Sequence, residues 1–412
     1  MADGCGFVEN AYFCKMKFGA WRAWQAHRYS PKKFGAYRYF RTLKILNIMK
    51  KRLFVLMLCI IGVLSSCSQN GQEKLGLFPI MKDGKWGYMD KTGKVVIEPQ
   101  FDGASLFSDG LAMVWVGDKE GYIDKTGKMV IESQGDWAWE FSEGLAGVKI
   151  NGKWGYIDKT GKMVIEPQFD EAKAFSEGLA RVRIEGKFGY IDKTGKIVIN
   201  PQFDKADDFS EGLACVGIGD RWGYIDKTGK IVINPQFDKA DDFSEGLARV
   251  AIDDGWSGIC RGGYIDKTGK MVIEPQFDYA WNFSEGLACV NIGDKCGYID
   301  KRGKMVIGPQ FDYAEDFSEG LAPVIIGGER GKYGYIDKKG QFVINPQFDE
   351  VGPFFEGLAY VRIGDKVGYI DRTGEMIYSW EEEDITDEEI KEAFTIVTEA
   401  LNEALTLELG EE

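Results

Sequence analysis

Most of the chain consists of near-copies of one segment, for which residues 153–170, KWGYIDKTGKMVIEPQFD, serve as the example. Aligning the copies on their Gly-Tyr pair gives nine glycines: Gly87, Gly121, Gly155, Gly189, Gly223, Gly263, Gly297, Gly334 and Gly368. Successive glycines lie 34 residues apart, except for one interval of 40 and one of 37. A period of about 20 to 50 residues is typical of solenoids, propellers and arrays. We therefore predict one repeat domain over residues 77–380.

Each copy predicts a meander of short antiparallel strands. Apolar and charged side chains alternate over 179–184 (LARVRI), which is the pattern of a half-buried strand. A two-residue turn such as Asn151-Gly152 then leads into the Trp-Gly-Tyr-Ile strand. A second reversal at 158–162 precedes a third strand at 163–165, which is expected to end at Pro167 because proline has no N–H to donate. The rest of the copy predicts either a short fourth strand or an ordered loop.

One copy alone has too few large apolar side chains to offset the entropy of ordering its backbone. Neighbouring copies must therefore bury each other's faces. We predict an all-β array of nine antiparallel meanders that is propeller-like. An open superhelical solenoid is the alternative, because nine units exceed the four to eight blades usual in a closed ring. The residue before Gly-Tyr is predicted to pack between copies: Trp86, Trp154, Trp222, Phe188 or Tyr333, with Glu120, Cys296 and Val367 elsewhere.

Residues 49–66 have the marks of a secretion signal, namely a basic start, an apolar run and small residues before a break. As a helix, the twelve residues from Leu53 to Leu64 would span about 18 Å, less than a hydrocarbon core of about 30 Å. The ending LSSC resembles the lipobox of bacterial lipoproteins, which implies cleavage before Cys67 and acylation of that cysteine. An ordinary signal with a chance cysteine is the alternative. Residues 67–76 predict a short polar tether.

The two ends of the chain depart from the repeat pattern. Because a secretion signal works at the N-terminus, we interpret residues 1–48 as an over-extended, disordered start before translation at Met49. A basic nucleic-acid arm is the alternative. Residues 381–412 contain thirteen acidic residues and one lysine. A capping-box pattern at Thr386–Glu389 and an apolar stripe predict an amphipathic helix from about Asp387 to Leu407, which either caps the last repeat or docks a partner.

Charge and histidine content exclude several functions. The chain has a net charge of −14, but residues 1–52 are strongly basic, so the part from Cys67 onward carries −24. Such a surface should repel nucleic acid and anionic lipid. We expect no nucleic-acid partner, and membrane contact only through the lipid anchor. The single histidine, His27, lies outside the repeats, which excludes Ser-His-Asp or Cys-His catalysis and His-ligated zinc there.

Recurring carboxylates are the main candidates for chemistry. One aspartate recurs after the Gly-Tyr strand in every copy: Asp90, Asp124, Asp158, Asp192, Asp226, Asp266, Asp300, Asp337 and Asp371. These residues suit a ring for Ca²⁺ or a cationic ligand, but a residue present in every copy is better explained as the cap of its own turn. The glutamate of Ser-Glu-Gly is interpreted likewise: Glu143, Glu177, Glu211, Glu245, Glu285 and Glu319. We predict no catalytic residue, metal site or cofactor.

Four cysteines follow Cys67, namely Cys215, Cys260, Cys289 and Cys296. The predicted hairpin makes Cys289 and Cys296 diagonal neighbours about 7 to 8 Å apart, which is poor geometry for a disulfide. Cys260, in a loop, is the most adaptable. Two insertions, Asp253–Gly262 and Gly327–Gly331, lengthen hairpins before the Gly-Tyr pair. They indicate either a binding face or harmless loop growth.

The recurring KWGYID…GKxVIxPQFD…FSEGLA pattern resembles the WG-repeat proteins of bacteria over Leu77–Tyr378. Copies around Gly121, Gly297 and Gly368 lack the tryptophan. The resemblance implies a secreted or surface repeat protein that binds or scaffolds, with no agreed catalytic residues. We therefore expect a non-enzymatic, lipid-anchored protein of the bacterial cell envelope, at the outer membrane, cell surface or periplasm, with an envelope protein or glycan as partner. An envelope glycan hydrolase with paired carboxylates and a purely structural spacer are the alternatives.

Overall fold

The computed structural model describes residues 76–117, 119–132, 137–253, 260–328 and 331–381. The secretion signal, Cys67, nearly all of the tether and the predicted C-terminal helix lie outside these residues. Within them the regular elements are β-strands, which form nine separate antiparallel sheets. The search for membrane-spanning helices, confined to the same residues, found no helix with the length and apolarity to cross a bilayer.

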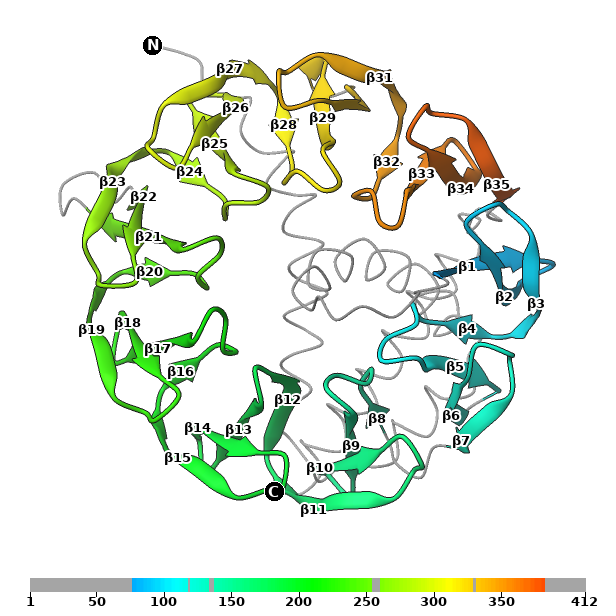
Figure 1. Ribbon diagram of the computed structural model, residues 1–412, viewed down its shortest axis with the longest axis horizontal. Helices are drawn as coiled ribbons and strands as arrows, with labels where there is room; N and C mark the ends of the chain where they lie inside the picture. The colour runs from blue at the N-terminus through cyan, green and yellow to red at the C-terminus, as the bar shows by residue number, and fades with distance from the viewer. Residues whose placement is uncertain (1–75, 118, 133–136, 254–259, 329–330, 382–412) are drawn as a thin grey trace, which may run out of the picture. The chain divides into compact units, whose positions relative to one another are not determined.

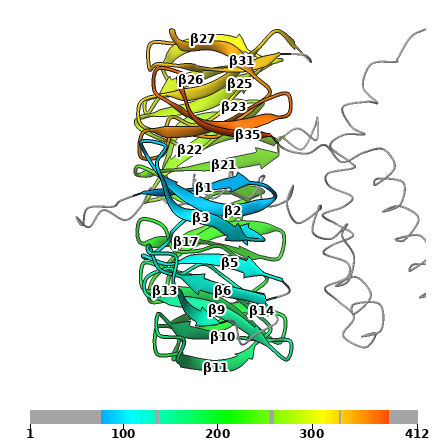
Figure 2. The same cartoon turned by 90° about the vertical axis from the view of Figure 1, so that its right-hand side faces the viewer.

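The sheets stand as nine blades around one axis (Figures 1 and 2). The strands nearest the axis are β4 (Gly103–Ala104), β8 (Trp137–Ala138), β12 (Glu171–Ser176), β16 (Lys205–Ala206), β20 (Lys239–Ala240), β24 (Tyr279–Ala280), β28 (Tyr313–Ala314) and β32 (Glu350–Val351). The second strands are β1 (Leu77–Lys82), β5 (Ala112–Val116), β9 (Leu145–Ile150), β13 (Leu179–Ile184), β17 (Leu213–Ile218), β21 (Leu247–Asp253), β25 (Leu287–Ile292), β29 (Ala322–Ile326) and β33 (Leu358–Ile363).

The third strands carry the Gly-Tyr pair. They are β2 (Lys85–Asp90), β6 (Lys119–Ile123), β10 (Lys153–Asp158), β14 (Lys187–Asp192), β18 (Arg221–Asp226), β22 (Cys260–Asp266), β26 (Lys295–Asp300), β30 (Lys332–Ile336) and β34 (Lys366–Asp371). The outermost strands are β3 (Val95–Phe101), β7 (Met129–Glu132), β11 (Met163–Phe169), β15 (Ile197–Phe203), β19 (Ile231–Phe237), β23 (Met271–Phe277), β27 (Met305–Phe311), β31 (Phe342–Phe348) and β35 (Met376–Glu381).

Each blade is out of phase with the sequence repeat. The segment after the outermost strand forms the innermost strand of the next blade, so that β16 pairs with β17. The fourth-strand prediction is therefore confirmed, but this strand belongs to the following sheet. Because the ninth copy ends before this segment, one innermost strand is missing, and the first sheet, β1-β2-β3, has three strands where the others have four.

The outermost strand does not end at its proline, so that prediction is wrong. Strand β11 runs through Pro167 to Phe169. A register shift next to Gly155 lets Phe169 pair with Trp154 on the other side of the irregularity. Proline is tolerated on edge strands and at bulges, and it removes a donor from an edge that would otherwise invite pairing with another chain.

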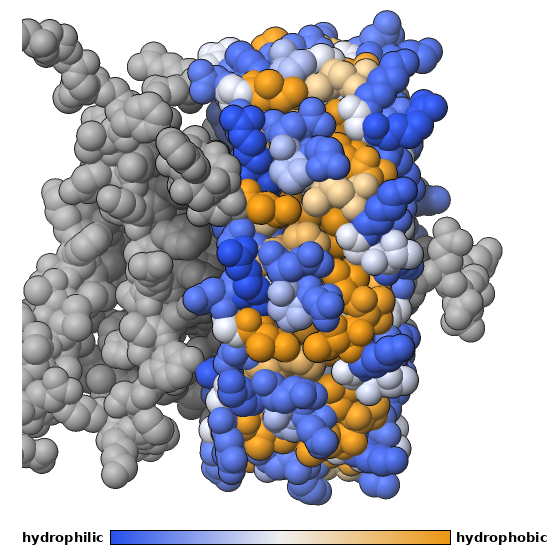
Figure 3. All heavy atoms as spheres, turned by 90° about the vertical axis from the view of Figure 1, so that its left-hand side faces the viewer, coloured by the Kyte–Doolittle hydropathy of each residue, from blue (hydrophilic) through white to orange (hydrophobic). Residues whose placement is uncertain are grey.

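The outer strands also carry a row of exposed valines, which we call the outer valines. They are Val96, Val130, Val164, Val198, Val232, Val272, Val306 and Val343, each 40–47% exposed. Figure 3 shows apolar side chains on this outer face, gathered in patches between polar ones. Single exposed apolar residues are common on soluble proteins.

Tyrosine hydroxyls join each blade to the next. Tyr190 of β14 donates to the carbonyl of Asp207 in the following blade at 2.7 Å, and its ring meets Phe209 edge-on at 4.9 Å. The nine donors are Tyr88, Tyr122, Tyr156, Tyr190, Tyr224, Tyr264, Tyr298, Tyr335 and Tyr369, with bonds of 2.6–3.1 Å. Since a buried hydroxyl needs a partner, each tyrosine fixes the position of its neighbouring blade.

The Ser-Glu-Gly segment forms a second link between blades. Ser176 donates its hydroxyl to the carbonyl of Phe209 at 2.7 Å, while Glu177 accepts the N–H of Gly212 at 2.9 Å and pairs with Lys227 at 3.1 Å. The φ angle of Glu177 is 52°, which confirms the predicted turn position. A positive φ is costly for a residue with a Cβ, and here it directs the carboxylate to the next blade. The turn interpretation was therefore incomplete.

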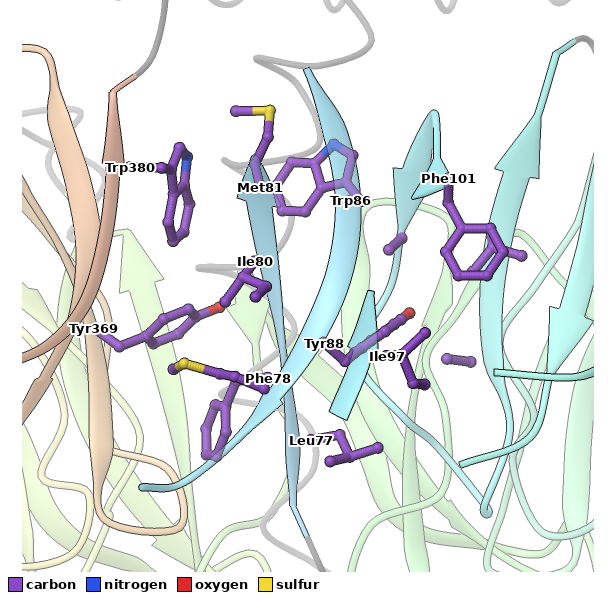
Figure 4. Packing of buried hydrophobic residues seen from close by; sticks show 14 of the residues in the cluster. Leu77, Phe78, Ile80, Met81, Trp86, Tyr88, Ile97, Phe101, Tyr369 and Trp380 are labelled. Atoms are coloured by element: carbon purple, nitrogen blue, oxygen red, sulfur yellow. The ribbon is translucent and has the colours of Figure 1, made fainter. Parts of the chain in front are cut away.

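The first and last sheets meet and close the ring (Figure 4). Tyr369 of β34 donates to the carbonyl of Pro79 in β1 at 3.1 Å. Trp380 of β35 packs edge-on against Trp86 of β2 with centroids 6.3 Å apart, and Phe78 meets Tyr369 at 5.5 Å. The propeller prediction is therefore confirmed, and the open superhelical alternative is wrong.

Closure repeats the links found between other blades but shares no strand among the described residues. The sheet β1-β2-β3 comes from the first copy, and the sheet β32-β33-β34-β35 comes from the eighth and ninth. A Cβ added to Gly76 would lie 1.7 Å from Oε2 of Glu356. This carboxylate thus lies against Gly76 much as Glu319 lies against Gly357, whose N–H it accepts at 3.0 Å. Side-chain packing therefore carries the closure.

Candidate functional site

The recurring aspartates cap turns and do not converge on one site. Oδ1 of Asp158 accepts the N–H groups of Thr160 and Lys162 at 2.8 and 3.1 Å and the hydroxyl of Thr160 at 2.6 Å. All nine aspartates accept the N–H groups two and four residues further on. The hydrogen bond from the Thr160 hydroxyl is the main cause that lowers the pKa of Asp158. The turn-cap prediction is confirmed.

The copies differ most in the segment that forms the innermost strand. Its second residue is small and buried, alanine in seven blades and Val351 in the eighth. We call its first, third and fourth residues the inner surface. The first residues are Gly103, Trp137, Glu171, Lys205, Lys239, Tyr279, Tyr313 and Glu350; the third are Ser105, Trp139, Lys173, Asp207, Asp241, Trp281, Glu315 and Gly352; the fourth are Leu106, Glu140, Ala174, Asp208, Asp242, Asn282, Asp316 and Pro353.

The contrast between constant and varying positions identifies this candidate site. The constant serine, glutamate, tyrosine and phenylalanine residues hold one blade to the next, so each copy must keep them. The inner-surface residues have no such common role, and they lie on the strands nearest the axis (Figure 1). Our sequence analysis missed them, although aligning the copies shows the signal: three varying residues around one alanine, between Gln-Phe-Asp and Phe-Ser.

Exposed aromatic rings form one component of the inner surface. Tyr279 is 47%, Trp137 42% and Tyr313 37% exposed. The Tyr279 ring meets Trp281 edge-on at 4.5 Å, and the Arg249 guanidinium of the preceding blade lies over it at 4.9 Å. Large rings exposed beside cations are common in recognition surfaces, because they offer apolar area and a polar edge together.

Partly buried carboxylates form the other component. Burial raises the pKa of Glu140 to about 7. Burial also raises the pKa of Asp242 to about 7, with further contributions from Asp207, Asp208 and Asp241. The same cause raises the pKa of Glu315 to about 7 and that of Asp316 to about 6. Carboxyl groups from several blades therefore titrate near neutral pH on this surface.

These raised pKa values predict that the protein loses stability as pH rises from about 4 to about 7. An unfolded carboxyl has a pKa near 4, so the folded state binds more protons across this window and the unfolding free energy falls with increasing pH. Thermal unfolding at pH 5, 6, 7 and 8 measures the effect. The double variant Asp242→Asn/Glu315→Gln should show a smaller fall in Tm. Equal slopes for the variant and the wild type would contradict this assignment.

The remaining sequence candidates fall elsewhere. Cys215, Cys289 and Cys296 are buried and free, and the side chain of Cys260 lies outside the described part. The two insertions fall between β21 and β22 and between β29 and β30, the hairpins that join second and third strands. In the part of the chain that the structure describes, no group of three or more His, Cys, Asp or Glu residues has the arrangement of a metal site.

The predicted packing role of the aromatic residue before Gly-Tyr holds in several blades. Trp86 and Trp154 are buried, and Trp154 stacks on Trp139 of its own blade at 5.3 Å. Trp222 is half-buried beneath Lys205, whose ammonium lies 5.6 Å from the ring. In the sixth copy the position is Gly262, so a large side chain is not required there.

Comparison with known families decides the identity of the repeat. The model described as "WG containing repeat" matches eight segments, residues 86–119, 121–154, 154–188, 188–222, 222–256, 263–296, 297–329 and 333–366. The chain belongs to the WG-repeat family. The matches cover more than half of the chain, and the blades explain the family name, since the glycine of each Trp-Gly pair lies beside the register shift of the outer strand.

Solved structures support the propeller fold of this WG-repeat protein and nothing finer. A structure described as a eukaryotic initiation factor aligns with a TM-score of 0.57 and 12% identity, over 75% of this chain and 96% of the other. A puromycin hydrolase aligns with a TM-score of 0.33 and 11% identity, over 66% of this chain and 54% of the other. No curated protein matches the sequence.

Proposed function

We propose that this WG-repeat protein is a non-enzymatic binding or scaffold module of the bacterial cell envelope, anchored by lipid at Cys67. The lipobox resemblance supports the anchor. The propeller supports a binding role, because it supplies a rigid frame on which side chains can vary while the links between blades stay constant.

The observation that carries the binding proposal is the placement of exposed aromatic residues on the inner surface. Trp137, Tyr279 and Tyr313 occupy equivalent positions in three blades, at 37–47% exposure. A purely structural spacer gains nothing from three large rings that pack against solvent. Carboxylates lie close by on the same surface, so the partner should present apolar faces together with cationic groups. A basic envelope protein fits this chemistry better than a neutral glycan.

The binding test uses the full mature chain with Cys67→Ser, which removes the acyl chain, immobilised and incubated with envelope extract. The variant Trp137→Ser/Tyr279→Ser/Tyr313→Ser should lose at least tenfold of the bound partner, measured by quantitative mass spectrometry. The matched control, Val164→Ser/Val232→Ser/Val306→Ser, removes three similarly exposed side chains from the outer valines and should retain it. Equal capture by both variants would overturn the assignment, and no specific capture by the wild type would favour the spacer.

A further inference from the structure

Two cysteines of one blade meet on the same face of their sheet. Cys289 lies in β25 and Cys296 in β26, where Cys296 pairs with Asn291 and Cys289 pairs with Tyr298. The two are diagonal neighbours, as predicted, but the Cys289 thiol donates a hydrogen bond to the Cys296 sulfur. The diagonal backbone separation therefore does not keep the sulfur atoms apart.

The surroundings of the pair favour one proton shared between two sulfurs. The Asn291 amide lies 3.6 Å from the Cys296 sulfur and donates to it. Cys289 also lies 3.6 Å from the carbonyl of Ala314 in the next blade. The hydrogen bond from Cys289 lowers the pKa of Cys296 to about 6, and the same bond raises that of Cys289. At neutral pH the pair thus consists of a Cys296 thiolate beside a Cys289 thiol.

This contact belongs to the architecture and is not an accident of one blade. The same two positions hold Arg181 and Phe188 in another blade, where the guanidinium lies 5.5 Å from the ring centroid. In a third blade a Cβ added to Gly147 would lie 3.6 Å from the Trp154 ring. Because the fold brings these two side chains together in several blades, cysteines at both positions are placed to react with each other.

Burial limits which oxidant can reach the pair. Cys289 is 0% and Cys296 1% exposed. A protein disulfide needs direct access to an attacking thiolate, so an enzyme partner is excluded while the blade stays folded. A small hydroperoxide needs only a local opening of the sheet.

We propose that Cys289 and Cys296 form a reversible redox pair that a hydroperoxide converts into a disulfide. The Cys296 thiolate attacks one peroxide oxygen, the O–O bond breaks, hydroxide leaves and Cys296 becomes a sulfenic acid. Cys289 then attacks the Cys296 sulfur, its S–S bond forms as the S–O bond breaks, and the sulfenic oxygen leaves as water with the Cys289 proton. Overall the two thiols are oxidised by two electrons and the peroxide is reduced.

The test exposes the folded full chain with Cys67→Ser to hydrogen peroxide and maps the thiols by mass spectrometry after non-reducing digestion. A cross-linked peptide joining Cys289 to Cys296 is expected, and dithiothreitol should abolish it. Cys215 is the internal control, because it is equally buried and lies 3.6 Å from the Ala240 carbonyl, but its diagonal neighbour is Trp222. Cys215 should stay reduced.

A second measurement separates the two roles within the pair. In Cys289→Ser the Cys296 sulfenic acid has no partner thiol and should accumulate as an adduct with dimedone, without a cross-link. Oxidation of Cys296 no faster than Cys215 in the wild type would overturn the proposal. A disulfide from Cys296 to Cys260, or wild-type oxidation of Cys296 without any cross-link, would overturn it as well.

Discussion

Trp380→Ala is expected to lower the unfolding free energy by about 3 to 5 kcal/mol, the usual cost of removing a large buried aromatic side chain. Trp380 is buried at the ring closure, where it packs against Trp86 at 6.3 Å and Tyr369 at 6.0 Å. No strand links the two blades in the described residues, so a cavity at this point should also separate them. Urea unfolding monitored by circular dichroism measures the loss of stability.

The matched control for this closure is Trp154→Ala. Trp154 is also buried and stacks on Trp139 at 5.3 Å, but its blade is connected through the chain on both sides. Both variants should lose comparable stability. Only Trp380→Ala should speed amide hydrogen exchange selectively in β1–β3 and β33–β35, because only there does packing alone hold neighbouring blades. Selective exchange in both variants, or in neither, would show that closure does not depend on Trp380.

Gly223→Ala should destabilise the protein by about 3 kcal/mol or more, at the upper end of the cost of overpacking. A Cβ at Gly223 would lie 2.5 Å from the carbonyl oxygen of Ile233 and 2.6 Å from the nitrogen of Pro235. Both atoms belong to the backbone of the outermost strand, so they cannot move aside as a flexible side chain would. The lowered urea midpoint should be accompanied by faster hydrogen exchange in β18 and β19.

Gly308→Ala provides the control in an outermost strand. A Cβ at Gly308 would meet no atom within 4 Å, and the φ angle of Gly308 is not positive. Such a substitution restricts the unfolded chain and should leave stability unchanged or raise it by about 0.4 to 1 kcal/mol. If Gly223→Ala were as harmless as Gly308→Ala, the close approach between β18 and β19 would not explain the repeated glycine.

The local structure could be predicted because its causes lie within a few residues. Alternation in 179–184 predicts a strand, a pair such as Asn151-Gly152 predicts its hairpin, and Asp158 predicts the cap of the following turn. The structure bears out each of these. The error at Pro167 has a local cause too, since proline stops a ladder only where a donor is required, and β11 is an edge strand.

The inner surface was open to prediction only in part. The varying residues around the recurring alanine are visible in the sequence, but their grouping on the strands nearest the axis depends on how the innermost segment pairs. This segment joins the following sheet, as β16 joins β17. That choice is made by contacts between copies, which no single copy contains.

The sequence by itself therefore determined nine repeats, their strands and turns, and their mutual dependence for burial. Only the tertiary structure decided that the nine blades close into a ring, that each blade is completed by the preceding copy, and that Cys289 reaches Cys296. The physical reason is that strand and turn preferences act over a few residues. Closure depends instead on the angle between blades summed around the ring, which is set by interblade contacts such as Tyr190 with Asp207 and Trp86 with Trp380.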